Sequence, residues 1–146
     1  MASTPPERIR AARERAGLEP FDLAQQLELP FAHYCDLEMF EDEAATTISL
    51  ETLQHLGRLL GLTPLQILEG DEAVVPSVRL SFAEFSSAVA AAITKAGGDV
   101  DAWEDEAGWE VRPLLQDPET IWKLDAEALG DIAKAAGVDW RAVLPE

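Results

Sequence analysis

The segment between Ser49 and Leu68 has the pattern of two short helices joined by a tight turn, and it limits the possible folds more than any other stretch. Ser49 is of the residue type that caps helix N-termini. Apolar side chains then recur at helical spacing, at Leu53, Leu56 and Leu60. Gly61 is suited to end this helix, and Thr63 followed by Pro64 to open the next one. Because the chain has no convincing strand signal, we expect an all-α fold.

Caps and helical spacing of the same kind divide the rest of the first half. Helices are predicted to begin near Pro6, Pro20 and Pro30, and residues 41–47 are expected to form a polar loop. The apolar residues that define these helices and the short one after Pro64 are Ile9, Ala12, Ala16, Phe21, Leu23, Ala24, Leu27, Tyr34, Leu37, Ile67 and Leu68. The expected organisation is a helical domain over residues 1–70, a linker at 71–79, and a C-terminal helical domain at 80–146.

The second half opens with a strong helix signal, because Ser81 and Glu84 have the spacing of a capping box. This alanine-rich helix is expected to end at Gly97. A second long helix is expected to begin after Asp125 and to end at Gly137. The sequence between them is acidic and aromatic at 99–109, with a further cap and first-turn proline at 117–119. The residues expected to be buried by the two long helices are Phe85, Val89, Ile93, Leu129, Ile132 and Ala136.

The two halves can be aligned with each other by laying Gly61 on Gly137. The caps and apolar positions of the two helices that end there then superpose, and the first helices of each half match at Gly17 and Gly97. Two interpretations remain open. The second half is a degenerate copy of the first, or amphipathic helices that end in glycine align through that shared pattern alone.

The chain carries a strong negative charge, with a formal net charge of −17 and a pI near 4.3. Such a chain repels nucleic acid and anionic lipid, so a basic protein is the expected partner. The single cysteine, Cys35, excludes an internal disulfide and fits a reducing compartment. We recognise no signal peptide and no apolar run long enough to span a membrane, and therefore expect a cytoplasmic protein.

No constellation of residues in the sequence points to catalysis or to a metal. His33 and Cys35 lie two positions apart on a predicted helix and therefore point in different directions, and His55 is distant in sequence. No glycine-rich phosphate loop follows a strand. We expect a protein that is not an enzyme, without catalytic residues, cofactor or metal.

Five short motifs in the first half occur at characteristic positions. They are IRAARERAGL at 9–18, LA at 23–24, LE at 37–38, SLETL at 49–53 and LGLTPLQIL at 60–68. In combination they resemble the Cro and phage-repressor family of helix-turn-helix domains, often called XRE-like. The resemblance implies a compact five-helix domain over residues 7–70, with 20–27 and 30–38 as its helix pair. Family resemblance of this kind does not by itself imply DNA binding.

The positions that contact DNA in this family depart from its pattern. Glu19 and Pro20 stand where the family has a Ser or Thr and then a Gln, which bond the phosphate backbone. Glu28 replaces the turn glycine, at a cost of roughly 1 kcal/mol if the residue must adopt a positive φ, so we expect a remodelled turn. Pro30 removes another helix N-terminal amide. Residues 16–57 contain nine carboxylates and no lysine or arginine.

The nearest positive charges belong to the first helix, at Arg8, Arg10, Arg13 and Arg15. Glu7 and Glu14 are spaced to form intrahelical ion pairs with Arg10. These arginines are therefore expected to be solvated or paired within the helix, with a partner site as the alternative. Among the groove-facing positions of the predicted helix pair, only His33 has a side chain that could donate a hydrogen bond to a base edge.

An apolar centre with an acidic rim remains on the surface that would read DNA. The centre is Phe31, Met39 and Phe40, and the rim is Asp36, Glu38, Glu41, Asp42 and Glu43. This composition is typical of a protein interface that selects a basic partner, whereas the alternative is that Phe31 and Phe40 pack into the core. The predicted partner-binding residues are Phe31, Asp36, Met39, Phe40, Glu41 and Asp42.

Three of the tryptophans in the second half raise the same question. They are Trp103, Trp109 and Trp122, in and after the acidic segment 99–110. Tryptophans in a module of this size most often belong to the core, and the alternative is an acidic–aromatic strip that clasps a basic helix.

Three functions follow as expectations. The first is a non-catalytic, regulatory or protein-binding module that uses an acidic XRE-like fold to bind a basic protein, as a toxin neutraliser, adaptor or assembly factor. The alternative is a DNA-binding XRE-family transcriptional regulator that acts as a dimer, with residues 31–36 in the major groove. The third is an acidic mimic of DNA. The sequence does not predict the oligomeric state.

Overall fold

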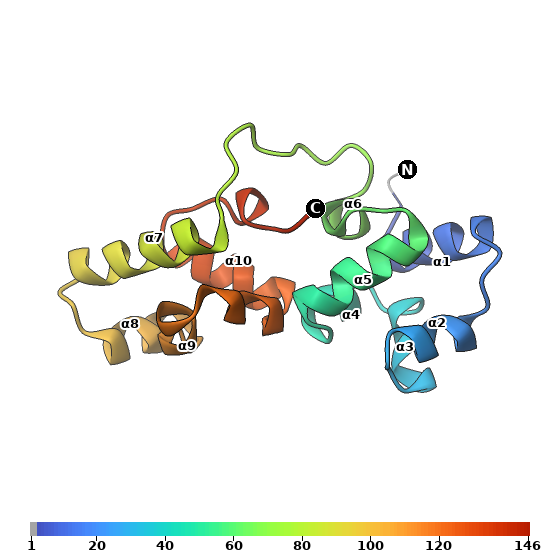
Figure 1. Cartoon of the computed structure of the whole chain (residues 1–146), viewed down its shortest axis with the longest axis horizontal. Helices are drawn as coiled ribbons and strands as arrows, with labels where there is room; N and C mark the ends of the chain where they lie inside the picture. The colour runs from blue at the N-terminus through green and yellow to red at the C-terminus, as the bar shows by residue number, and fades with distance from the viewer. Residues whose placement is uncertain (1–2) are drawn as a thin grey trace. The chain divides into compact units, whose positions relative to one another are not determined.

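The computed structural model describes residues 3–146 and confirms an all-α fold, with no strand in that range. The chain divides into two compact units (Figure 1). Unit 1 comprises the chain up to Val74 together with Pro145–Glu146, and unit 2 comprises Val75–Leu144. The division falls within the predicted linker 71–79, where Val74, Val75 and Val78 are exposed.

Unit 1 is built from six helices among its described residues. They are α1 (Pro5–Arg15), α2 (Pro20–Gln26), α3 (Phe31–Leu37), α4 (Glu43–Thr46), α5 (Leu50–Leu60) and α6 (Pro64–Glu69). Helix α1 packs against α3, α5 and α6, while α2 packs against α3. The buried apolar side chains of unit 1 are Ile9, Ala12, Leu23, Ala24, Leu27, Tyr34, Leu37, Ala44, Ile48, Leu50, Leu53, Leu56, Leu60, Leu65 and Ile67.

Local sequence signals account for where α1 begins. Thr4 and Glu7 form a capping box, in which the side chain of each bonds the backbone amide of the other. Such reciprocal bonds satisfy two amides that a helix N-terminus leaves unpaired. Arg8 then ties α1 to the end of α6, because its Nε and Nη2 donate to the Ile67 carbonyl at 3.0 and 2.8 Å.

The turn between α5 and α6 requires glycine at two positions. Gly61 ends α5 in the left-handed conformation, with φ of 72°. Gly57 lies inside α5, where a Cβ atom would collide with the Leu62 carbonyl oxygen. The chain folds back so closely here that the Leu62 amide donates to the Gly57 carbonyl at 2.8 Å. Thr63 then opens α6 with the expected cap, which forms a second capping box with Gln66.

The turn between α2 and α3 contains a residue in the left-handed conformation, which glycine adopts most readily, but the residue there is Glu28. Glu28 has φ of 57° and is the sole residue other than glycine with a positive φ among residues 3–146. Its amide donates to the Gln25 carbonyl at 3.1 Å, and the Leu29 amide to the Ala24 carbonyl at 2.9 Å. The expectation of a remodelled turn was therefore wrong: the hydrogen bonds and the buried Leu27 hold Glu28 in a left-handed conformation.

We expect Glu28→Gly to stabilise unit 1 by about 0.5–1 kcal/mol. Glycine removes the steric cost of the left-handed conformation, and its greater freedom in the unfolded chain offsets part of that gain. Urea unfolding of the wild type and the variant measures the difference. Glu28→Ala is the matched control, because it removes the same carboxylate and keeps the strain. Equal stability of the glycine and alanine variants would contradict the account.

The predicted polar loop at 41–47 contains a helix that the sequence did not indicate. Helix α4 forms a single turn, and Ala44 is buried against the neighbouring helices α3 and α6. Its amide hydrogen bonds run from Ala45 and Thr46 to the Asp42 carbonyl. One turn with one buried alanine is too short to produce a recognisable hydrophobic period.

Four expected core positions differ from the prediction. Ala16, which follows the end of α1, and Phe21 are exposed, whereas Leu68 and Ala136 are only partly buried. Leu65 is buried in α6 in place of Leu68. The remaining core residues named from the sequence are buried as expected.

Unit 2 is also entirely helical in its described residues. Its elements are α7 (Phe82–Lys95), α8 (Val100–Ala107), α9 (Arg112–Gln116), the 3₁₀ helix η1 (Pro118–Lys123), α10 (Ala126–Ala135) and the 3₁₀ helix η2 (Trp140–Ala142). The predicted capping box of Ser81 and Glu84 opens α7, and Asp125 caps α10. Phe85, Val89 and Ile93 bury one side of α7, which packs against α9, η1 and α10.

The order of elements in unit 2 parallels that of unit 1, but the packing differs. In unit 1 the second helix, α2, packs chiefly against α3. In unit 2 the second helix, α8, packs against α10, while α9 packs against η1 and α7. A duplication of one domain stays a prediction, because the shared order of elements is not matched by a shared set of contacts.

Candidate protein-binding surface

The candidate site is the outer side of α2, α3 and α4 in unit 1. Four large apolar side chains are exposed there, with exposed fractions of 55% for Phe21, 49% for Phe31, 64% for Met39 and 48% for Phe40. We call these four residues, with Asp36, Glu41 and Asp42, the α3 surface. Phe31 and Phe40 are therefore not packed in the core of unit 1. An isolated apolar side chain at a surface needs no explanation, but four around one short helix indicate a contact surface.

Phe21 and Phe31 form a pair at the start of α3. Their ring centroids are 5.9 Å apart with an interplanar angle of 57°, a geometry in which aromatic rings attract each other. Sequence reasoning placed Phe21 among the residues that define α2 and did not count it as a contact residue. The signal was present, because Phe21 precedes the buried Leu23 by two positions and so points to the other side of the helix.

Met39 and Phe40 lie at the opposite end of α3. The rise of an α-helix places them about 12 Å along the axis from Phe31. The structure thus brings Phe31 together with Phe21, and Met39 with Phe40, rather than gathering Phe31, Met39 and Phe40 in a single cluster. Two separate groups of exposed apolar side chains therefore flank α3.

Carboxylates accompany the second of these clusters. Glu41 and Asp42 are exposed, and Asp36 on the last turn of α3 is partly exposed. Residues 16–57 supply no lysine or arginine to neutralise them. An exposed apolar centre beside unpaired carboxylates favours a partner with lysine or arginine around an apolar contact.

Glu38 is not part of this acidic rim, which corrects the expectation from the sequence. Its side chain is 8% exposed and accepts two hydrogen bonds from Arg13, Nε to Oε2 at 2.8 Å and Nη2 to Oε1 at 3.1 Å. Arg13 Nη1 also donates to the Leu18 carbonyl at 3.0 Å. The pair holds the end of α3 against α1, so Glu38 supports the α3 surface from behind.

The surroundings of this pair set the protonation of Glu38 and Tyr34. Burial acts to raise the pKa of Glu38, but the hydrogen bonds and positive charge of Arg13 outweigh it, so the pKa lies below the ordinary value. Burial also raises the pKa of Tyr34, and the nearby Glu38 carboxylate adds to that effect. The Tyr34 hydroxyl is fully enclosed and has no partner within hydrogen-bonding geometry. Both groups therefore keep their usual charge states at neutral pH.

The arginines of α1 bind other helices rather than forming the expected intrahelical pairs with Glu7 and Glu14. Arg10 Nη2 donates to the Glu38 carbonyl at 3.0 Å, and its Nε lies 3.5 Å from Glu38 Oε1. Arg13 forms an ion pair with the same carboxylate, and Arg8 donates hydrogen bonds to the Ile67 carbonyl in α6. Three of the four arginines thus hold unit 1 together.

His33 has a structural partner directly after the neighbouring helix α4. Its Nε2 lies 2.9 Å from Thr47 Oγ1, and that hydroxyl donates to the Glu43 carbonyl at 2.8 Å. With its proton given to the Glu43 carbonyl, the Thr47 hydroxyl accepts from His33 in the tautomer that carries the proton on Nε2. The donor expected to be free for a base edge instead links α3 to the residue after α4.

The three tryptophans singled out from the sequence, Trp103, Trp109 and Trp122, make contacts within unit 2. Trp103 is 7% exposed. Trp109 is partly buried and donates from Nε1 to Asp131 at 2.9 Å, and Trp122 donates to Glu119 at 3.1 Å and packs edge-on against Phe82. Trp103 is therefore a core residue, whereas Trp109 and Trp122 are only partly buried and bond to carboxylates at the surface of the unit.

A search of residues 3–146 finds no group of three or more His, Cys, Asp or Glu side chains placed to hold a metal ion. In the same part of the chain, no helix is both long and apolar enough to cross a membrane. Cys35 is a free thiol on α3 and is partly exposed.

Comparisons with protein-family models, with curated proteins and with solved structures find no match to this chain.

Proposed function

We propose that the protein is a non-catalytic binding module whose α3 surface docks onto a basic protein. The observation that supports this most strongly is the exposure of Phe21, Phe31, Met39 and Phe40 next to Glu41 and Asp42. Exposed aromatic and methionine side chains provide the apolar contact, and the carboxylates select partners with positive charge and speed their association. A toxin neutraliser, an adaptor and an assembly factor all fit this chemistry.

An XRE-like helix-turn-helix frame is the second part of the proposal. Its support is the left-handed residue between α2 and α3 at Glu28, where the family has its turn glycine, and the packing of these two helices. On this frame the pair of Phe21 and Phe31 occupies the side that faces DNA in repressors. The frame is then used for a protein contact.

Binding to DNA fits the same surface poorly. Specific DNA-binding proteins typically make about 6–10 phosphate contacts through positive or amide groups. Here Pro20 and Pro30 lack amide protons at the starts of the two helices, and Arg8, Arg10 and Arg13 are bonded within unit 1. A dimeric transcriptional regulator remains the alternative function, with a partner copy as the source of any basic surface.

Affinity capture from a lysate of the native host tests the proposal. We expect the wild type to recover a basic protein in stoichiometric amount, and Phe31→Ser/Phe40→Ser to weaken its binding roughly 30-fold or more, because truncated aromatic contacts are typical hot spots. Both phenylalanines are half exposed, so the fold should tolerate the changes. Val74→Ser/Val78→Ser is the control, since it removes two exposed apolar side chains outside the α3 surface. Unchanged recovery with the phenylalanine variant would rule out the α3 surface as the docking site.

A further inference from the structure

The longest stretch without a helix among the described residues joins α6 to α7. Residues 74–78 lie at its middle, and we call them the valine segment. Its three valines, Val74, Val75 and Val78, have exposed fractions of 78%, 48% and 72%. The proposed function uses none of them. Exposed apolar side chains gathered on one short segment indicate a contact with another molecule.

The backbone of the valine segment has no partner within residues 3–146. Its amides donate no hydrogen bond to a described residue, and its carbonyls accept none. Hydrogen bonds on either side hold the segment in place. The Ala73 amide donates to the Gly70 carbonyl at 3.2 Å, and the Leu80 amide to the Ala142 carbonyl at 2.9 Å. Free backbone groups on a tethered segment can pair with a strand of another protein.

The sequence of the segment favours an extended chain that pairs along one edge. Valine is β-branched and favours strands, and Pro76 restricts the preceding Val75 to extended conformations. In an extended chain, the amides of alternate residues point to the same side. Val75 and Ser77 therefore present their amides along one edge, whereas Pro76 leaves a gap along the other. The first edge can pair without interruption.

The side chains of the segment narrow the class of protein that fits it. A serine protease binds its substrate as an extended strand, and its S1 pocket receives the side chain before the cleaved bond. The valine segment has no aromatic or basic side chain for a large or an acidic S1 pocket. Arg79 follows the segment, but its guanidinium donates to the carbonyls of Arg141 and Leu144. A small S1 pocket fits the segment best.

The position of Pro76 selects one bond within the segment. A cut after Val74 or Val78 would place Pro76 on the pairing edge, where its missing amide interrupts the hydrogen bonds. A cut after Val75 would require proline as the leaving residue, whose ring carries the nitrogen. A cut after Ser77 avoids both, because Val75 and Ser77 then form the pairing edge. Ser77 is small and exposed, as a small S1 pocket requires.

We propose that the valine segment is a cleavage site for a serine endoprotease with a small S1 pocket, cut between Ser77 and Val78. The protease's serine attacks the Ser77 carbonyl carbon, and Val78 leaves as a free amine. Water then hydrolyses the acyl-enzyme and leaves a carboxylate on Ser77. The cut breaks the chain between residues 1–77, which carry the α3 surface, and residues 78–146. The inference does not depend on what the α3 surface binds.

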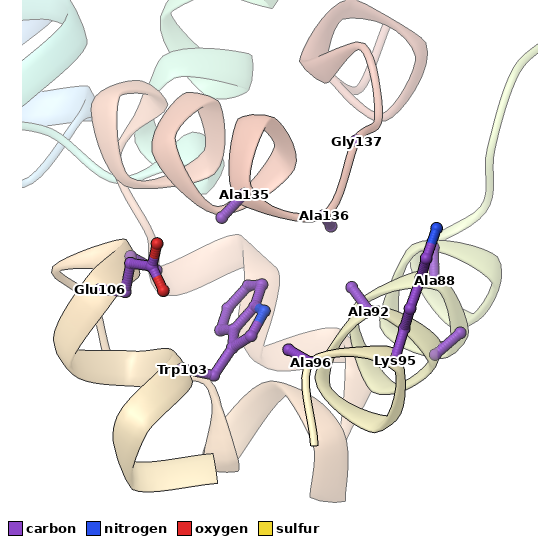
Figure 2. Close-up of a pocket in the computed structure, with 11 residues that line it drawn as sticks. Ala88, Ala92, Lys95, Ala96, Trp103, Glu106, Ala135, Ala136 and Gly137 are labelled. Carbon is purple, nitrogen blue, oxygen red and sulfur yellow. The ribbon is translucent and has the colours of Figure 1, made fainter. Parts of the chain in front are cut away.

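The groove around Trp103 shows that small residues alone do not make such a site. Alanine accounts for seven of the eleven residues that line this groove between α7, α8 and α10 (Figure 2). All seven lie in these helices or directly after them. The two that follow a helix, Ala96 and Ala136, donate their amides to helix carbonyls at 3.0 Å. This backbone cannot pair as a strand while the helices are folded, so we expect no early cut there.

Limited digestion of the full chain with pancreatic elastase, whose S1 pocket is small, tests the proposal. Mass spectrometry of the first two fragments identifies the bond that is cut. We expect residues 1–77 and 78–146 as the first products. A first cut at any other bond, within the segment or in a helix, would overturn the proposal.

Two proline variants test the pairing edge. Val75→Pro removes an amide from that edge and should slow the cut by about tenfold or more. Val74→Pro is the matched control, because the Val74 amide lies on the opposite edge, and it should change the rate by less than about twofold. Both positions are exposed and outside the helices, so the fold should tolerate the changes. Equal rates for the two variants would contradict the assignment.

Ser77→Lys separates access to the bond from the choice of side chain. Lysine does not fit a small S1 pocket but fits the acidic pocket of trypsin. We therefore expect elastase to stop cutting at this bond and trypsin to cut the variant there. Resistance of the variant to trypsin at this bond would show that the segment is closed to proteases. Continued cutting by elastase at this bond would show that the small pocket does not select it.

Discussion

Replacing Arg13 by methionine is expected to lower the free energy of unfolding of unit 1 by about 3 kcal/mol. The substitution leaves the Glu38 carboxylate, 8% exposed, without the guanidinium that donates two hydrogen bonds to it. Arg10 Nε stays 3.5 Å from Glu38 Oε1, but Arg10 is half exposed and compensates the carboxylate only in part. Removing the close partner of a largely buried ion pair costs more than the pair itself contributes. Urea unfolding measures the loss. The control is Arg15→Met on the same helix, where an exposed arginine should cost no more than about 0.5 kcal/mol.

The pH dependence of this loss follows from the lowered pKa of Glu38. A carboxyl group with a lowered pKa in the folded state stabilises the fold above its unfolded pKa, about 4.3 for glutamate, and that stabilisation is lost as the pH falls through the folded pKa. The deficit of Arg13→Met should therefore be largest near neutral pH and shrink as Glu38 becomes protonated. A deficit that is constant from neutral pH down to about pH 3.5 would show that packing, rather than the ion pair, is the cause.

The second large effect is expected on partner binding. Glu41→Lys/Asp42→Lys should weaken the complex with a basic partner by about 2–3 kcal/mol, or roughly 30- to 150-fold, because two attractive contacts become repulsive. Surface plasmon resonance over a range of salt concentrations measures this, and most of the change at low salt should appear in the association rate. Both side chains are exposed, so the stability of unit 1 should change little.

A control with the same change in net charge separates local from overall electrostatics. Glu72→Lys/Asp105→Lys alters two exposed carboxylates outside the α3 surface. It should reduce affinity only a few-fold, through the long-range field of the protein. Equal losses in the two variants would mean that the partner responds to the net charge of −17 rather than to the α3 surface.

The sequence predicts the helices of this protein well wherever a cap and an apolar period agree. Helix α5 runs from the residue after Ser49 to the residue before Gly61, as the pattern indicates. Helix α7 likewise begins after its capping box at Ser81. Helix α4 was not predicted, because its four residues, with a single buried alanine, show no hydrophobic periodicity. A helix this short depends on its contacts with α3 and α6.

Where the sequence-based predictions were wrong, contacts between helices determine the observed structure. Glu28 was expected to force a different turn, but the turn's hydrogen bonds and the packing of α2 on α3 keep it in a left-handed conformation. Glu38 was counted with the acidic rim because no arginine is near it in sequence. Its partner Arg13 is 25 residues away, and a pairing over that distance is invisible to helical spacing.

The candidate site was predicted in part. Phe31, Met39 and Phe40 are exposed, which excludes their burial in unit 1. The sequence did not show that Phe21 joins Phe31, or that Met39 and Phe40 lie apart from them, because the faces of α2 and α3 meet only in the folded structure. The groove around Trp103 was also missed, since residues from three helices form it.

The central claim is that unit 1 offers a surface for a basic protein and none for phosphate, and a titration with random-sequence duplex DNA at low salt tests it most directly. Non-specific DNA binders have dissociation constants of about 10⁻⁴–10⁻⁶ M even at physiological salt, and they bind more tightly as salt is lowered. We predict no binding by the full chain at about 20 mM salt with DNA at micromolar concentration. Salt-sensitive binding under these conditions, with an affinity that falls steeply as salt is added, would contradict the account and favour the dimeric regulator.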